Sequence, residues 1–106
     1  MRPVKEIDKL IEDYEAYLLL EKGLANNTGL SYCNDVRHLA EFMISKGLNV
    51  DTLKAEYLHE FLALVHELGI SPRSQARMLS GVKSFFNFLI LEGYIEENPC
   101  EFIESP

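Results

Sequence analysis

The sequence has few of the residues that mark metal centres, disulfide scaffolds and membrane proteins. It contains two cysteines, Cys33 and Cys100, and neither has a second Cys or a His at metal-ligand spacing. Neither a zinc site nor a disulfide framework is therefore expected, and both thiols are interpreted as reduced and partly buried. No apolar run is long enough to span a membrane, and the opening segment MRPVKEIDKL lacks the apolar centre of a signal peptide. These absences predict a soluble cytoplasmic chain with no membrane partner.

Basic residues are also scarce. The chain has 10 Lys and Arg against 17 Asp and Glu, which gives a net charge of −7 at pH 7. This balance argues at first against nucleic-acid binding, because phosphates are neutralised by Lys and Arg. The acids are unevenly distributed, however: none occurs at positions 68–91, where Arg73, Arg77 and Lys83 lie, and none at positions 24–34. Together the two acid-free segments could form one non-acidic face on an acidic body.

Apolar residues recur at helical spacing in four stretches, and no stretch has the alternation of a β-strand. The helices are expected over residues 4–22, from the N-cap Asn27 to about Gly47, from the turn LNVDT to Gly69, and from Pro72 to Glu92. Ser71 is expected to cap the fourth helix, and a short helical turn is expected from Pro99. With 106 residues, of which 47% are hydrophobic, the sequence predicts one all-α domain over residues 1–106, a four-helix bundle.

The fourth predicted helix has two distinct faces when its residues are placed at about 100° each. The core face carries Met78, Leu79, Val82, Phe85, Phe86, Leu89 and Ile90. The opposite face carries Arg73, Ala76, Arg77, Ser80, Lys83, Ser84 and Asn87. A solvated face normally mixes charges of both signs, whereas this face has only small, polar and basic residues. It suits a phosphate backbone or the base edges of a major groove, and the alternative is that the cations simply face water.

Three motifs follow one another along nearly the whole chain. The first is E-x-G-L-x-x-N-T with a Tyr and an Asp after it, here Glu21, Gly23, Leu24, Asn27, Thr28, Tyr32 and Asp35. The second is R-S-x-A-R-x-L-S with an aromatic pair, here Arg73, Ser74, Ala76, Arg77, Leu79, Ser80, Phe85 and Phe86. The third joins E-G and N-P to E-S-P, here Glu92, Gly93, Asn98, Pro99, Glu104, Ser105 and Pro106. In this order the motifs resemble the N-terminal core-binding domain of tyrosine site-specific recombinases of the Xer and phage integrase group.

The resemblance implies a SAM-like fold of two crossed helical hairpins that clamps double-stranded DNA, with the second and fourth helices on the DNA side. It also implies a separate C-terminal catalytic domain, absent from this chain, that cleaves and rejoins strands in DNA integration or chromosome dimer resolution. The E-S-P ending favours a chromosomal Xer recombinase over a mobile-element integrase. Family members act as tetramers on DNA, so other protomers are expected partners, although the isolated domain is expected to be monomeric.

No catalysis is expected from this chain, because it lacks the H-x-x-R pattern of the family's catalytic residues. The family's arginines, lysine and histidines stabilise the reacting phosphate while a tyrosine attacks it. No cofactor and no metal are expected either. His59 and His66 are two turns apart on the third predicted helix and are interpreted as surface or boundary histidines.

The expected DNA contacts come from the second and fourth helices: Asn27, Thr28, Ser31, Arg37, Arg73, Ser74, Arg77, Ser80, Lys83 and Ser84. Asn27 and Thr28 could equally be helix caps. Asp35 disfavours a phosphate and is expected to orient a neighbouring arginine or a backbone group. Lys83 stands where family members usually have arginine, so base-specific recognition there is not expected. Gly81 indicates close approach either of DNA or of a neighbouring helix.

The competing interpretation is a helical protein-interaction module, because an acidic surface suits a basic partner. Leu19, Leu20, Leu64 and Phe88 are apolar positions that the predicted core faces do not use. They could form a patch for a protein partner or for a neighbouring recombinase protomer. Because the body is acidic, DNA affinity of the isolated domain is expected to be weak and steeply dependent on salt.

Overall fold

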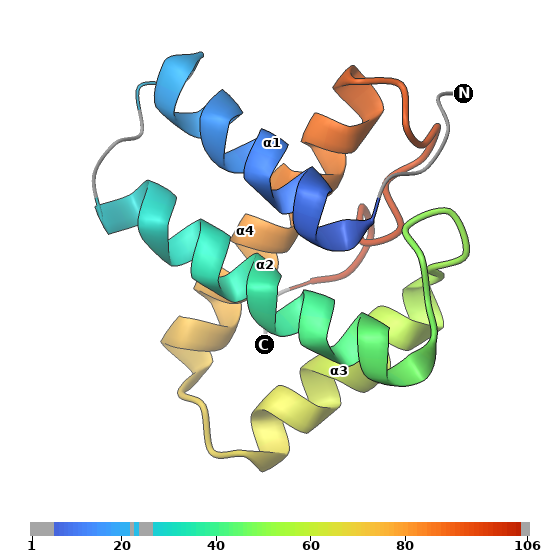
Figure 1. The fold of residues 1–106 in the computed structure, drawn as a ribbon. Helices are drawn as coiled ribbons and strands as arrows, with labels where there is room; N and C mark the ends of the chain where they lie inside the picture. Colours follow the sequence, from blue (N-terminus) through green and yellow to red (C-terminus); the bar gives the residue numbers. More distant parts are fainter. Residues whose placement is uncertain (1–5, 22, 24–26, 105–106) are drawn as a thin grey trace.

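The structure is a computed structural model that describes residues 6–21, 23 and 27–104. It contains four α-helices, α1 (Ile7–Leu20), α2 (Asn27–Lys46), α3 (Ala55–Glu67) and α4 (Pro72–Leu91), shown in Figure 1. No strand occurs in these described ranges, so the predicted all-α class is confirmed. Residues 4, 5 and 22, which were expected in the first helix, lie outside the described residues.

The helix ends follow the local chemistry of the sequence. Ser71 caps α4 as predicted, with its hydroxyl oxygen accepting a hydrogen bond from the Ser74 N–H at 3.2 Å. Gly47 and Gly93 follow α2 and α4 with φ of 69° and 79°, a conformation that glycine adopts without steric cost. Asn27 is the first residue of α2 and not its N-cap, since a cap precedes the first helical residue.

The expected helical turn near Pro99 is a turn over residues 99–102 that does not continue as a helix. Two backbone hydrogen bonds close this region, from Glu101 to Asn98 at 3.1 Å and from Ile103 to Cys100 at 3.2 Å.

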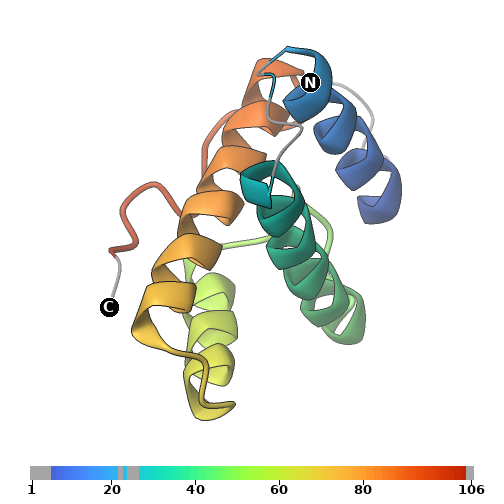
Figure 2. The same ribbon diagram turned by 90° about the vertical axis from the view of Figure 1, so that its left-hand side faces the viewer.

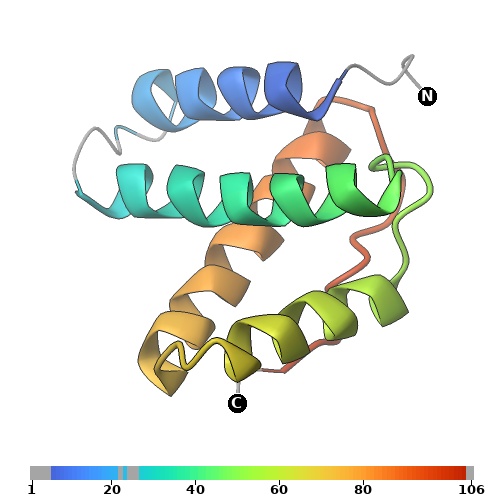
Figure 3. The ribbon, with the colours of Figure 1, turned by 60° about the horizontal axis from the view of Figure 1, so that its bottom comes forward.

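α1 and α2 lie side by side and antiparallel, and α4 crosses behind both of them (Figure 3). The most extensive helix pairing is between α2 and α4, and α4 also contacts α1 and α3. Gly81 lies where α4 closely approaches α2: a Cβ built on it would come within 3.2 Å of Tyr32 Cδ1 and 3.3 Å of Tyr32 Cα. The close approach indicated by Gly81 is therefore to a neighbouring helix.

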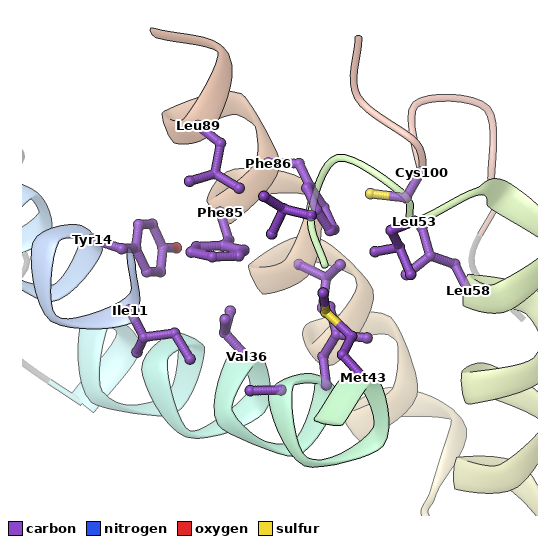
Figure 4. Packing of buried hydrophobic residues seen from close by; sticks show 14 of the residues in the cluster. Ile11, Tyr14, Val36, Met43, Leu53, Leu58, Phe85, Phe86, Leu89 and Cys100 are labelled. Carbon is purple, nitrogen blue, oxygen red and sulfur yellow. The ribbon is translucent and has the colours of Figure 1, made fainter. Parts of the chain in front are cut away.

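The core forms where these helices cross (Figure 4). Six of the seven predicted core residues of α4 are buried, and Ile90 packs against them while partly exposed. Tyr14 of α1 reaches the same core, 5.3 Å from Phe85 between ring centroids. None of the helices in the described part of the chain is both long and apolar enough to cross a membrane.

Two expectations about burial were wrong. Phe88 is not a spare surface position: it is 4% exposed and its ring lies 4.9 Å from that of Tyr17, because α1 covers a second face of α4. Cys33 and Cys100 are free thiols, as expected, but they are fully buried rather than partly buried. Burial raises the pKa of both thiols, that of Cys100 to about 12.

Candidate nucleic-acid interface

The described parts of the two acid-free segments, residues 27–34 and 68–91, meet where α2 packs against α4. Figure 2 shows the N-terminal end of α2 beside α4 on the face turned to the viewer. The contact between Gly81 and Tyr32 is what allows this meeting, because it lets the two helix backbones approach closely. Residues of this face that are exposed include Asn27, Thr28, Arg73, Arg77 and Ser80, while Ser31 and Ser74 are half-buried.

Asp35 and Arg77 form a bidentate ion pair between α2 and α4. Arg77 Nε donates to Asp35 Oδ2 and Arg77 Nη2 donates to Asp35 Oδ1, both at 2.9 Å. The aspartate side chain is 4% exposed, whereas that of Arg77 is 46% exposed. The hydrogen bonding of Arg77 to the Asp35 carboxylate, which accepts, raises the pKa of Arg77, so the guanidinium keeps its charge. The expectation that Asp35 orients a neighbouring arginine is confirmed.

Arg37 and Ser84 lie toward α1, away from Arg73. Arg37 Nη2 is paired with Glu15 Oε2 at 2.8 Å, in a surface pair whose two side chains are about half exposed. The Ser84 hydroxyl accepts a hydrogen bond from the Tyr14 hydroxyl at 2.9 Å. The structure therefore gives both side chains a partner on α1 and does not bring them together with the other predicted contacts.

Lys83 is half-buried under the segment that follows α4, residues 95–104, which we call the C-terminal segment. The Asn98 side chain holds this segment, donating from Nδ2 to the Lys83 carbonyl at 3.2 Å and to Asn87 Oδ1 at 3.0 Å. A shallow pocket between them is lined by Lys83, Asn87, Ile90, Glu96, Glu97, Asn98 and Glu101. The C-terminal segment thus places carboxylates beside the second half of α4, where they would repel phosphates.

The open, non-acidic part of the face is consequently its first half. It consists of Arg73, Ser74, Arg77 and Ser80 on α4 together with the N-terminal end of α2. An apolar groove of about 490 Å³ lies beside it, between α2, α3 and the start of α4. Asp35, His38, Ser74 and Arg77 lie among its polar lining, with Phe61, Leu64 and Met78 among its apolar lining.

Sequence reasoning missed Gln75, which is 4% exposed. Its Nε2 donates to the Ile70 carbonyl at 2.7 Å and lies 3.3 Å from His66 Nδ1. These contacts join the start of α4 to the end of α3. The sequence could have indicated that Gln75 is buried, because it precedes Met78 and Leu79 by one helical turn and so lies on the core face of α4.

In the part of the chain that the structure describes, no three His, Cys, Asp or Glu side chains gather closely enough to hold a metal ion. His59 and His66 are both exposed.

Residues 11–93 match the family described as "Phage integrase, N-terminal SAM-like domain". The chain belongs to this family. The predicted resemblance to tyrosine recombinases is thereby confirmed, as is the SAM-like, all-α fold.

Relatives of this phage integrase SAM-like domain carry the name "Tyrosine recombinase XerD". One from Listeria monocytogenes serotype 4b (strain F2365) is 35% identical over 102 residues, which cover 94% of this chain and 34% of the relative. One from Staphylococcus saprophyticus is 33% identical over 101 residues, with the same two coverages. One from Pseudomonas aeruginosa is 34% identical over 97 residues, covering 92% of this chain and 33% of the relative. The chain thus spans about a third of the length of the curated relatives it matches, and no solved structure matches it significantly.

Proposed function

We propose that this SAM-like domain binds double-stranded DNA for a tyrosine recombinase, with the first halves of α2 and α4 facing the phosphates. One observation carries the proposal: residues 27–34 of α2 and residues 72–91 of α4, which belong to two acid-free segments distant in the sequence, lie on helices that pack together in an otherwise acidic molecule. Arg73 is exposed there, and none of the described carboxylates lies within ion-pair distance of it. A cation on a face where the Asp35 carboxylate is buried and paired with Arg77 attracts phosphates despite the negative net charge.

The domain's part in recombination is proposed to be clamping the DNA site. Residues 1–106 would form one core-binding domain, and strand cleavage and rejoining would belong to the rest of the whole protein. The relatives named XerD support a role in DNA recombination, and the family resemblance makes chromosome dimer resolution or DNA integration the process served. In this role the domain would contribute binding and no catalytic group.

The test is a salt series of binding to short mixed-sequence duplex DNA with two variants of the proposed face. Arg73→Ala removes a phosphate-facing cation, and Ser80→Asp adds a carboxylate to the same exposed surface. Arg73→Ala should lower the magnitude of the slope of log K against log salt by about 0.9, the value for one lost phosphate contact. Ser80→Asp should weaken binding about tenfold or more at low salt, because it repels the phosphates.

Matched controls change the same charge elsewhere. Lys54→Ala removes an exposed cation before α3, and Ala63→Asp adds a carboxylate to the exposed side of α3. Both controls should bind nearly as the unchanged chain does at physiological salt. The proposal is wrong if Lys54→Ala changes the DNA affinity as much as Arg73→Ala does and Ala63→Asp as much as Ser80→Asp does. It is also wrong if the unchanged chain binds no duplex DNA at low salt.

Contacts with neighbouring protomers are a second proposed role, supported by a different observation. Leu19, Leu20 and Leu64 are 46%, 84% and 42% exposed, so three of the four apolar positions left over by the core faces do reach the surface. Exposed apolar side chains of this kind are suited to protein contacts, as in recombinase tetramers on DNA. Leu20→Ala should leave the DNA affinity of the single domain unchanged. A binding titration checks this affinity, and sedimentation equilibrium on the same sample gives the association state.

A further inference from the structure

We propose that Asp35 is a positioning residue for DNA binding: it holds Arg77 in the orientation that meets the phosphate backbone, and so strengthens binding although its own charge opposes it. The inference rests on the proposed function and names a residue that acts on DNA only through another. Asp35 was excluded as a direct phosphate contact by its charge, and its burial excludes it again.

The geometry of the pair leaves one edge of the guanidinium free. Both carboxylate oxygens of Asp35 are bonded to Arg77, through Nε and Nη2, at equal distances of 2.9 Å. Arginine has five N–H donors, so three remain, on Nη1 and Nη2, for an acceptor outside the molecule. Because the arginine side chain is 46% exposed and lies on the face with Arg73 and Ser80, that acceptor would lie on the bound DNA.

Stability alone gives a poor reason for this carboxylate. The Asp35 carboxylate loses its hydration on burial, and this cost offsets part of what the ion pair contributes to the stability of the fold. Asp35 projects from α2 into its contact with α4, where apolar packing already joins the two helices. The ion pair with Asp35 fixes the orientation of the long, flexible Arg77 side chain, which apolar packing would not do.

Immobilising a long side chain before binding removes an entropic cost that binding would otherwise carry. For one arginine this effect corresponds to about a 2- to 10-fold change in affinity. The bidentate fork also fixes the plane of the guanidinium, which suits a phosphate, whereas lysine would present only a point charge. A simple charge argument predicts the opposite sign, since removing a carboxylate near phosphates should tighten binding.

The decisive variant is Asp35→Asn, which keeps the side-chain shape and removes the charge. We expect it to bind short mixed-sequence duplex DNA about 2- to 10-fold more weakly than the unchanged chain at the same salt. Its control is Glu41→Gln, which removes a carboxylate from an exposed position of the same helix. Glu41 and Asp35 both line the apolar groove between α2, α3 and the start of α4. Glu41→Gln should bind equally well or slightly more tightly. Thermal unfolding of each variant shows whether it is folded at the temperature of the binding measurement.

Two further readouts separate positioning from a purely structural role. In a chain that carries Arg77→Gln, adding Asp35→Asn should cause no further loss of affinity, because Asp35 acts only through the arginine. The Arg77 Nε–H resonance in NMR should exchange slowly with water in the unchanged chain and rapidly in Asp35→Asn. Arg77→Lys, which keeps the charge pair and loses the fork, should weaken binding even if Asp35→Asn does not fold.

The outcomes distinguish this inference from the proposed function. If the unchanged chain binds DNA and Ser80→Asp weakens it, but Asp35→Asn and Arg77→Lys bind as well as the unchanged chain or better, Asp35 does not position Arg77 and only the inference is wrong. If the unchanged chain binds no DNA at low salt, the proposed function and the inference are both wrong.

Discussion

At the scale of single residues, Gly81 shows how a local cost permits a contact between helices. A glycine inside a helix costs about 1 kcal/mol relative to alanine. Here its missing side chain lets the α4 backbone lie against Tyr32 of α2, so the surfaces on either side of that crossing form one face. The sequence alone left open whether DNA or a helix fills the space beside Gly81, because a glycine indicates close approach without naming the neighbour.

Gly81→Ala is expected to destabilise the fold by about 1 kcal/mol, even though alanine is the better helix former. The added Cβ would lie 3.3 Å from Tyr32 Cα, which is backbone and can move only if α2 moves. Urea unfolding measures the change. The control is Ser80→Ala, an adjacent exposed site where the change should stay within about 0.5 kcal/mol. If Gly81→Ala is more stable than the unchanged chain, the prediction is wrong, and α2 moves away from the new methyl group at little cost.

At the scale of the elements, the four helices follow from apolar periodicity, capping by Ser71 and glycines at the helix ends. These signals are local, so the sequence contains them in full. Phe88 was misplaced because a helical wheel assigns one core face, whereas α4 is covered by α1 as well as by α2 and α3. The ion pair of Asp35 was anticipated, but its arginine was not identified, since the pairing depends on how two helices cross.

The C-terminal segment is the element that sequence periodicity could not place. It has no regular structure of its own. Its Ile95, Cys100 and Ile103 side chains are buried in the core, and the Asn98 side chain links it to α4 by hydrogen bonds. Asn98 donates to Lys83 and Asn87, and its Oδ1 accepts from the backbone N–H and the thiol of Cys100, each at 3.0 Å. Glu96, Glu97 and Glu101 of this segment lie beside Lys83 and Asn87 of α4, which limits the candidate interface to the first half of α4.

Asn98→Ala should therefore loosen the C-terminal segment without unfolding the helices. Cys100 is completely buried, and burial raises its pKa to about 12, so its thiol should resist alkylation in the native state. Losing the Asn98 bonds should increase the alkylation rate of Cys100 about tenfold for each 1.4 kcal/mol of local stability lost. Cys33, buried within α2, is the internal control, and mass spectrometry follows both thiols in one sample. Equal acceleration at both thiols would instead indicate global destabilisation.

At the scale of the whole molecule, the question is how a chain of net charge −7 could hold DNA. The molecule measures 34 × 31 × 23 Å, whereas charges in about 0.15 M salt are screened within about 8 Å. Carboxylates on the side away from the DNA therefore hardly act on it at physiological salt. Those of the C-terminal segment lie within reach, because they line the same pocket as Lys83 and Asn87 of α4.

Changing Glu96, Glu97 and Glu101 together to Gln should accordingly tighten DNA binding about 3- to 10-fold at physiological salt. The control is a second triple variant, Glu6→Gln, Asp8→Asn and Glu12→Gln, which removes the same charge from the start of α1. Figure 2 shows α1 across the molecule from the C-terminal segment. At about 0.01 M salt, where screening extends to about 30 Å, the two triple variants should tighten binding to similar degrees. At physiological salt only the first should differ from the unchanged chain. If the two variants stay equal at both salt concentrations, the net charge governs binding and the C-terminal segment has no local effect on the interface.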